Sequence, residues 1–253
     1  MERAEAVSLQ RRALRGFVRL LGRSSEGSSV LHRDGVTASI VPAVPARSVI
    51  NSVVYSDAGA LASALGELED AFEGAGVAAW TVWVPDGERD AATLLADAGH
   101  RLDAEPLAMV RELADLPSPD AAGLDWDGAA APEDVGRIND LAYGFEVGTF
   151  GAAITHVPAD APLRLYQARV EGEPASVVGT LDEGSDCGIY LVATLKEHRG
   201  RGLAGKLLHV ALAEARERGL RTSTLQSTKF GRPVYERLGY EPVCAIQMWE
   251  RRR

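Results

Sequence analysis

Apolar and polar positions alternate along this chain in patterns that predict two successive sets of helices and strands. In the first set, apolar residues spaced three and four apart predict helices, and runs dense in β-branched residues predict strands. The helix that begins at Asp57 is well marked, because aspartate is a good N-cap and Gly74 ends the apolar spacing. The expected helices span residues 4–21, 57–74 and 89–98, and the expected strands span residues 36–41, 48–55, 78–84 and 107–113.

The second set follows a segment, residues 116–128, in which proline, glycine and aspartate replace the regular apolar spacing. We therefore expect an N-terminal domain over residues 1–117, a linker over 118–128 and a C-terminal domain over 129–253. An irregular loop is expected over residues 144–161. The other expected elements are helices over 133–143, 202–218 and 232–238, and strands over 163–170, 175–181, 187–194, 222–227 and 243–249.

The two halves end in a similar way, which suggests an internal duplication. Residues 94–111 and 235–250 each run from a short helix through a glycine to a strand that contains a methionine. The spacing from Gly99 to Met109 is 10 residues, and the spacing from Gly239 to Met248 is 9 residues. A chance resemblance between two helix-strand units is the alternative explanation.

Composition and charge narrow the class of protein. With 253 residues, 46% hydrophobic and 25% charged, the chain is typical of a globular protein with two cores, and no apolar run is long enough to span a membrane. The net charge of −9 argues against broad binding to nucleic acid or anionic membranes. Cys187 and Cys244 form no metal-binding or disulfide pattern, so we expect no metal site. The arginine-rich stretch 11–23 is interpreted as a surface helix rather than a targeting signal, and a cytoplasmic location is expected.

The most informative motif lies between the strand 187–194 and the helix that follows it. Residues 199–206 read Arg-Gly-Arg-Gly-Leu-Ala-Gly-Lys. Glycines let a backbone approach a bulky anion, and the start of a helix presents unpaired N–H groups, so this run predicts a pyrophosphate site. The spacing from Gly200 to Lys206 also fits a Walker A loop, but Leu207 stands where a serine or threonine should bind magnesium.

Read as R-x-x-G-x-A from Arg199 to Ala204, the run resembles the acetyl-CoA signature of the GNAT superfamily of N-acetyltransferases. The segment Val-Tyr-Glu-Arg-Leu-Gly-Tyr over residues 234–240 resembles the end of the same domain. The resemblance covers residues 129–253 and implies an α/β fold in which helices flank a mixed central β-sheet. Together with the internal similarity it suggests two tandem GNAT-like units, of which the N-terminal one is degenerate.

The resemblance implies an acetyl-CoA-dependent N-acetyltransferase without a metal, in which a primary amine attacks the bound thioester directly. It implies that the strand backbone pairs with the pantetheine arm, that the loop amides bind the pyrophosphate, and that Tyr235 protonates the departing thiolate. Thr228 and Gly231 stand where the family often has asparagine and alanine. The cofactor-binding residues implied are Val192, Ala193, Thr194, Arg199, Gly200, Arg201, Gly202, Leu203, Ala204, Gly205, Thr228, Gly231 and Tyr235.

The base that removes the proton from the attacking amine is not determined by any motif. Asp186 begins the strand that leads to Val192, and Glu146 and His156 lie in the irregular segment where the family usually binds its acceptor. Solvated surface roles are the simpler interpretation for all three. A chain of waters could also take the proton.

The N-terminal half lacks the glycine-rich loop. Asp57 stands at the corresponding helix start, where a carboxylate satisfies the amides itself and repels phosphate, so we expect this half not to bind acetyl-CoA. The expected partners of the chain are acetyl-CoA and an amine acceptor, and a homodimer is compatible with the sequence. The alternative function is a non-catalytic acyl-CoA sensor or interaction protein with the same fold.

Overall fold

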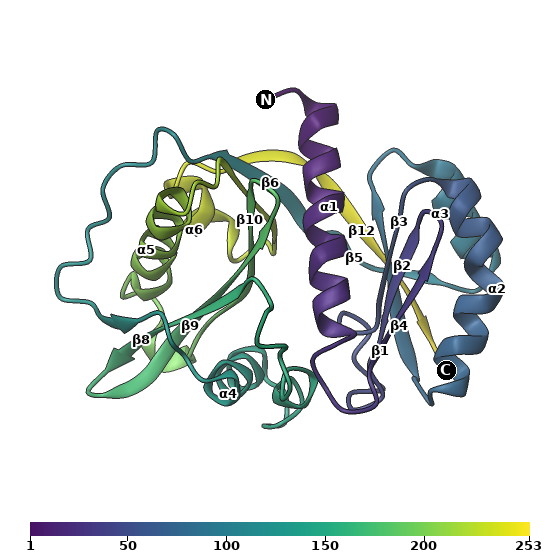
Figure 1. Cartoon of the computed structure of the whole chain (residues 1–253), viewed down its shortest axis with the longest axis horizontal. Coiled ribbons are helices and arrows are strands. Elements are labelled where there is room, and N and C mark those ends of the chain that lie inside the picture. The colour runs from purple at the N-terminus through teal and green to yellow at the C-terminus, as the bar shows by residue number, and fades with distance from the viewer. The chain divides into compact units, whose positions relative to one another are not determined.

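A computed structural model describes all 253 residues, and these form two compact units. Unit 1 comprises residues 1–108, 155–159 and 243–253, and unit 2 comprises residues 109–154 and 160–242. Each unit is a mixed β-sheet flanked by helices, which confirms the predicted fold class (Figure 1). None of the helices combines the length and hydrophobicity needed to cross a bilayer.

Unit 1 contains a sheet with the order β1-β2-β3-β4-β12, and β5 pairs with β12. β3 and β4 are parallel, whereas β1 with β2, β2 with β3, β4 with β12 and β5 with β12 are antiparallel. The elements of this unit are α1 (Arg3–Leu21), β1 (Ser29–Arg33), β2 (Val36–Ile40), β3 (Ser52–Tyr55), α2 (Ala58–Gly74), β4 (Ala79–Pro85), α3 (Arg89–Asp97), β5 (Arg101–Ala104) and β12 (Glu241–Arg252).

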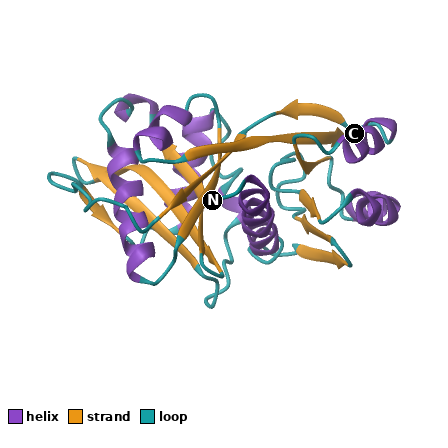
Figure 2. Cartoon of the chain, turned by 90° about the horizontal axis from the view of Figure 1, so that it is seen from above, coloured by secondary structure: helices purple, strands orange, loops and turns teal.

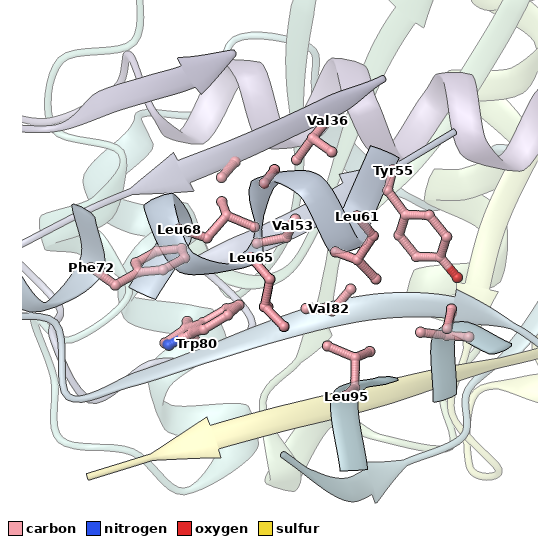
Figure 3. Packing of buried hydrophobic residues seen from close by; sticks show 14 of the residues in the cluster. Val36, Val53, Tyr55, Leu61, Leu65, Leu68, Phe72, Trp80, Val82 and Leu95 are labelled. Carbon is pink, nitrogen blue, oxygen red and sulfur yellow. The ribbon is translucent and has the colours of Figure 1, made fainter. Parts of the chain in front are cut away.

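The central strands β2, β3 and β4 are buried on both faces, because α1 and α2 cover opposite sides of the sheet (Figures 1 and 2). Successive side chains of a strand point to opposite faces. Tyr55 and Val82 accordingly pack in the cluster with α2, whereas Val54 and Trp83 pack in the cluster with α1. Figure 3 shows the α2 side of this core, which is lined by Leu61, Leu65, Leu68, Phe72 and Trp80 among others.

His100 is buried in unit 1, and its titration is expected to make the free energy of unfolding depend on pH. Its ring packs edge-on against Trp80, with centroids 4.6 Å apart, and neither ring nitrogen has a hydrogen-bond partner. Burial, with a further contribution from the Arg251 charge, lowers the pKa of His100 to about 4 from a model-peptide value of 6.5. Because the unfolded chain binds this proton more readily, the contribution of neutral His100 is complete above pH 6.5 and is lost as the pH falls toward 4.

We expect wild-type protein to lose about 3 kcal/mol of unfolding free energy through His100 between pH 7 and pH 4. His100→Phe keeps an aromatic ring against Trp80 but cannot titrate. Urea unfolding of both proteins across this range measures the effect, since other titrating groups contribute equally to both curves. Parallel pH curves for the two proteins would show that His100 does not titrate in this range.

Unit 2 contains a sheet with the order β6-β11-β10-β9-β8-β7, in which β10 and β11 are parallel. Helices α4 and α5 both pack against β9 and β10. The elements of this unit are β6 (Leu107–Glu112), β7 (Asp125–Asp127), α4 (Pro132–Tyr143), the 3-10 helix η1 (Gly151–Ala153), β8 (Leu163–Val170), β9 (Glu173–Glu183), β10 (Asp186–Thr194), the 3-10 helix η2 (Lys196–His198), α5 (Leu203–Glu217), β11 (Thr222–Ser227) and α6 (Arg232–Arg237).

The compact units do not coincide with the domains expected over residues 1–117 and 129–253, and those domain boundaries remain a prediction. The last strand, β12, belongs mostly to unit 1, where Ala79 to Pro85 of β4 pair antiparallel with Arg252 to Ile246. In return, most of β6 belongs to unit 2. A strand pairs through its backbone, so its apolar pattern does not reveal which sheet it joins.

Both halves nevertheless have the same order of elements. β3-α2-β4-α3-β5 corresponds to β10-α5-β11-α6-β12, and the first two strands of each series are parallel. The sequence similarity differs at the last strand, because it pairs the Met109 strand, β6, with the Met248 strand, β12. That the N-terminal half is a degenerate GNAT domain remains a prediction.

Most expected elements are present within a few residues, and three short strands were missed. Residues 29–33 form β1, which is joined to β2 by Asp34-Gly35, a dipeptide typical of tight hairpin turns that could have revealed the strand. The strand expected over 48–55 begins only at Ser52, because the buried Asn51 side chain organises the turn before it. Asn51 accepts from the Val41 amide at 2.7 Å and donates to the Val44 carbonyl at 3.1 Å. β5 and β7 are too short to give a pattern.

Candidate active site

The middle of unit 2 contains a β-bulge in β10, at the strand predicted to pair with a ligand. Tyr190 lies opposite Gly179 of β9, but Ala193 lies opposite Val177, so β10 carries one extra residue. Leu191 occupies this position with a φ of 57°, in the left-handed region. The parallel register of β10 with β11 covers only residues 186–188 against 222–224. The residues from Val192 to Thr194 therefore lie beyond the part of β10 that is paired with β11.

The loop that follows β10 presents a row of unpaired backbone N–H groups. Gly200 and Gly202 have φ values of 78° and 76°, which a residue without a side chain adopts without strain. Gly202 is the N-cap of α5, and no side chain caps this helix. The N–H groups of residues 200–205 have no acceptor in the protein. They combine with the positive end of the helix dipole to make a site suited to an anion.

The cations of this loop have different roles. The Arg199 guanidinium donates to the Ala142 carbonyl at 2.6 Å and to the Thr194 carbonyl at 3.1 Å, so it holds the loop against α4 and β10. The Lys206 ammonium donates to the Ala122 carbonyl at 2.9 Å. Arg201 is exposed and makes no ion pair or hydrogen bond. It is therefore the loop cation that is free to meet a bound anion.

The N-terminus of α5 has no side-chain cap, whereas the N-terminus of α2 in unit 1 is capped by Asp57. The Asp57 carboxylate accepts from the Ala60 amide at 2.9 Å, as the sequence predicted. This hydrogen bond, with further contributions from Ser56, Gly59 and Arg11, lowers the pKa of Asp57, so the group is a carboxylate at neutral pH. The N-terminus of α2 is thus occupied by its own negative charge, whereas that of α5 is open.

Tyr143 contacts the part of β10 that follows the bulge, and Tyr235 lies near Tyr143. The Tyr143 hydroxyl donates to the Val192 carbonyl at 3.2 Å. Tyr235 of α6 is buried, with 8% of its surface exposed, and its ring packs against Tyr240 with centroids 5.9 Å apart. The Tyr235 hydroxyl makes no hydrogen bond. Burial, together with the nearby Tyr143, raises the pKa of Tyr235 well above its ordinary value, so the phenol keeps its proton at neutral pH.

Thr228 and Gly231 have local structural roles at the start of α6. The Thr228 hydroxyl accepts from the Gly231 amide at 3.2 Å, so it is already engaged in the turn. A Cβ atom at Gly231 would lie 3.0 Å from Cε2 of Tyr235. Glycine at this position therefore leaves room for the Tyr235 ring.

The three candidates for a base lie in different places. Asp186 is buried at the first residue of β10, where its two oxygens accept from the Thr222 and Thr224 hydroxyls at 2.7 and 2.6 Å. Six residues of strand separate it from Val192, a distance of about 20 Å at about 3.3 Å per residue. Glu146 is exposed and its carboxylate has no partner. His156 belongs to unit 1, where its amide donates to the Ser24 carbonyl at 2.8 Å.

Two adjacent residues of α4, Asn139 and Asp140, were missed because an amide and a carboxylate inside a helix give no sequence signal. Both are buried. Asp140 accepts from the amides of Gly148 at 2.9 Å and Phe150 at 2.8 Å, so it fixes the loop that follows α4. Asn139 donates to the Leu191 carbonyl at the bulge. No cluster of histidine, cysteine or acidic side chains is arranged to hold a metal ion.

Comparisons with known proteins show a family match over part of the chain and a shared fold. Residues 152–248 match the family model described as "Acetyltransferase (GNAT) domain". The search of curated proteins gave no match. Among solved structures, the chain is similar to a GCN5-related N-acetyltransferase from Kribbella flavida, with a TM-score of 0.66, 20% identity and 94% of each chain covered.

Two further structures have the same fold over most of the chain. A GCN5-related N-acetyltransferase from Sphaerobacter thermophilus gives a TM-score of 0.58 and 17% identity, with 94% of this chain and 91% of that chain covered. A tandem GNAT protein from the clavulanic acid biosynthesis pathway gives a TM-score of 0.60 and 15% identity, with 95% of this chain and 87% of that chain covered. At these identities the likeness concerns the fold.

Proposed function

Because residues 152–248 match the model of the GNAT acetyltransferase domain, we propose that this protein is an acetyl-CoA-dependent N-acetyltransferase that acetylates a primary amine. One observation carries the proposal: the unpaired amides of residues 200–205 lie between the bulged strand β10 and α5, after the short helix η2, in the unit that contains most of the family match. These amides and Arg201 would hold the pyrophosphate of acetyl-CoA. The backbone of residues 192–194 would pair with its pantetheine arm.

The reaction that we propose is direct transfer. The amine nitrogen forms a bond to the thioester carbonyl carbon, and the bond from that carbon to sulfur breaks. The departing sulfur takes a proton from Tyr235, whose phenol is neutral and has no competing acceptor in the protein. The excess proton of the amine passes to a base, and solvent returns a proton to Tyr235. The products are an N-acetylated amine and coenzyme A.

Glu146 is the carboxylate that we propose as the base. It lies three residues after Tyr143 and is exposed, so it can accept a proton directly or through water. Asp186 is not proposed for this step, because both of its oxygens accept hydrogen bonds at the far end of β10.

The segment around Glu146 also bears on the acceptor. Leu141, Tyr143, Phe145 and Val147 are all exposed, and the rings of Tyr143 and Phe145 stack with centroids 6.4 Å apart. Asp140 holds this segment in place through the Gly148 and Phe150 amides. We therefore propose an acceptor whose amine is carried on an apolar or aromatic body, which would cover these side chains.

Release of coenzyme A tests the function. Purified protein is mixed with acetyl-CoA and a panel of arylalkylamines, polyamines, aminoglycosides and peptides, while free thiol is followed and acetylated products are identified by mass spectrometry. We expect turnover with at least one primary amine and higher kcat/KM for amines with an apolar body. Saturable binding of acetyl-CoA without turnover on any amine would favour the non-catalytic sensor. Absence of acetyl-CoA binding would refute both functions.

A further inference from the structure

We propose that Asn139 of α4 is a positioning residue that holds the β10 bulge in the shape needed to pair with acetyl-CoA. The inference rests on the proposed function of the strand that follows the bulge. It is carried by three residues from three elements that meet at one point: Leu191 in β10, Gly179 in β9 and Asn139 in α4.

Leu191 is in a conformation that its own side chain disfavours. Its φ of 57° places Cβ close to the backbone, a steric cost that glycine avoids and leucine does not. Glu171, in a surface turn, is the other non-glycine residue of the chain with a positive φ. A conformation of this kind persists only where surrounding contacts impose it.

The Asn139 carboxamide supplies such a contact. Its Nδ2 donates to the Leu191 carbonyl at 3.3 Å and to the Val135 carbonyl at 2.9 Å, so both hydrogens of the amide are used. The residue is 3% exposed, so water cannot easily replace it. Val135 lies one turn earlier in α4, and this second bond fixes the orientation of the carboxamide toward the bulge.

Gly179 provides the space that this arrangement needs. A Cβ atom at position 179 would lie 3.2 Å from the Tyr190 carbonyl oxygen and 3.3 Å from Cδ1 of Leu191. Glycine opposite the bulge therefore receives the Leu191 side chain, which the left-handed backbone directs toward β9. A side chain at position 179 would crowd Leu191, so glycine in β9 favours the observed conformation of the bulge.

The bulge sets the direction of the backbone that follows it. Asn139 and Tyr143 are four residues apart and so lie on one face of α4. They donate to the successive carbonyls of Leu191 and Val192. If Asn139 loses its donor, the carbonyl of Leu191 is released, and the strand can shift toward the regular register with β9. Such a shift would move every N–H and carbonyl group from Val192 to Thr194.

The test compares wild type with Asn139→Leu, which keeps the size of the side chain and removes the donor. We expect the Kd for acetyl-CoA to rise about 10-fold by calorimetry on folded protein. Without ligand, amide exchange of residues 189–194 should become at least about 10-fold faster, while the core of α5 is unchanged. Asn139→Ser, which is smaller and falls short of the bulge, serves if Asn139→Leu does not fold.

A second experiment tests whether strain at Leu191 is the reason why loss of Asn139 weakens binding of acetyl-CoA. In the background of Leu191→Gly, which adopts a positive φ without cost, the same Asn139→Leu change should alter the Kd by less than about 3-fold. An unchanged Kd and unchanged amide exchange in folded Asn139→Leu would overturn the inference, as would a full 10-fold effect in the glycine background. Failure of wild type to bind acetyl-CoA would instead refute the proposed function.

Discussion

Replacing Tyr235 by phenylalanine is expected to lower kcat about 100-fold, because the variant loses the phenol that we propose as the proton donor to the departing sulfur. A 100-fold loss corresponds to about 2.7 kcal/mol of transition-state stabilisation. The ring itself packs against Tyr240 and should stay in place. KM for acetyl-CoA should therefore change less than about 3-fold. Steady-state kinetics with a saturating amine measure both constants.

Tyr240→Phe is the matched control. It removes a second buried phenol hydroxyl from the same pair of rings, but this hydroxyl is bonded to Ser223 at 2.6 Å. We expect a loss of about 1 kcal/mol in unfolding free energy and kcat within about 3-fold of wild type. If Tyr235→Phe also kept kcat within about 2-fold, the acid role would be rejected and the ring would have a packing role only.

The second large effect is expected from Gly202→Asp, which places at α5 the carboxylate that α2 carries as Asp57. The new side chain would accept from the free amides of the first turn and would repel the pyrophosphate. Acetyl-CoA should bind about 100-fold more weakly, which corresponds to about 2.7 kcal/mol. Calorimetric titration with acetyl-CoA and with coenzyme A measures the change.

Gly202→Asn separates the charge from the change of shape. Asparagine tolerates the left-handed backbone at position 202 and can cap the helix, but it carries no charge. We expect it to weaken binding by about 10-fold, since it competes for the amides without repelling phosphate. Equal losses for the two variants would mean that the negative charge is unimportant, and wild-type affinity in both would place the anion elsewhere.

The glycine-rich loop before α5 and the aspartate at the start of α2 show how much of such a site a sequence can determine. The loop around Gly200 and Gly202 could be predicted from the sequence. Both residues have a positive φ in the structure, which few residues other than glycine adopt. Asp57 could be interpreted for the same reason, since an N-cap acts within three residues of itself. The order of helices and strands followed from apolar spacing, which is also a local property.

Only the tertiary structure decided which residues act together. Arg199 and Lys206 look like free cations in the sequence, but their side chains are bound to the distant carbonyls of Ala142 and Ala122. Asp186 has the right chemistry for a base and lies at the wrong end of its strand. Tyr143 meets Val192 across 49 residues of chain. Asn139 meets the bulge across 52, and neither contact leaves a pattern in the sequence around it.

The assignment of β12 to unit 1 also depends on contacts between residues that lie far apart in the sequence. The pattern of β12 specified a strand, but its partner β4 lies more than 150 residues earlier in the chain. The sequence by itself thus determined most of the elements, the glycine-rich loop before α5 and the aspartate cap of α2, because each depends on neighbouring residues. The tertiary structure decided the strand partners, the bulge and the residues that support it, because these depend on backbone groups that every residue carries.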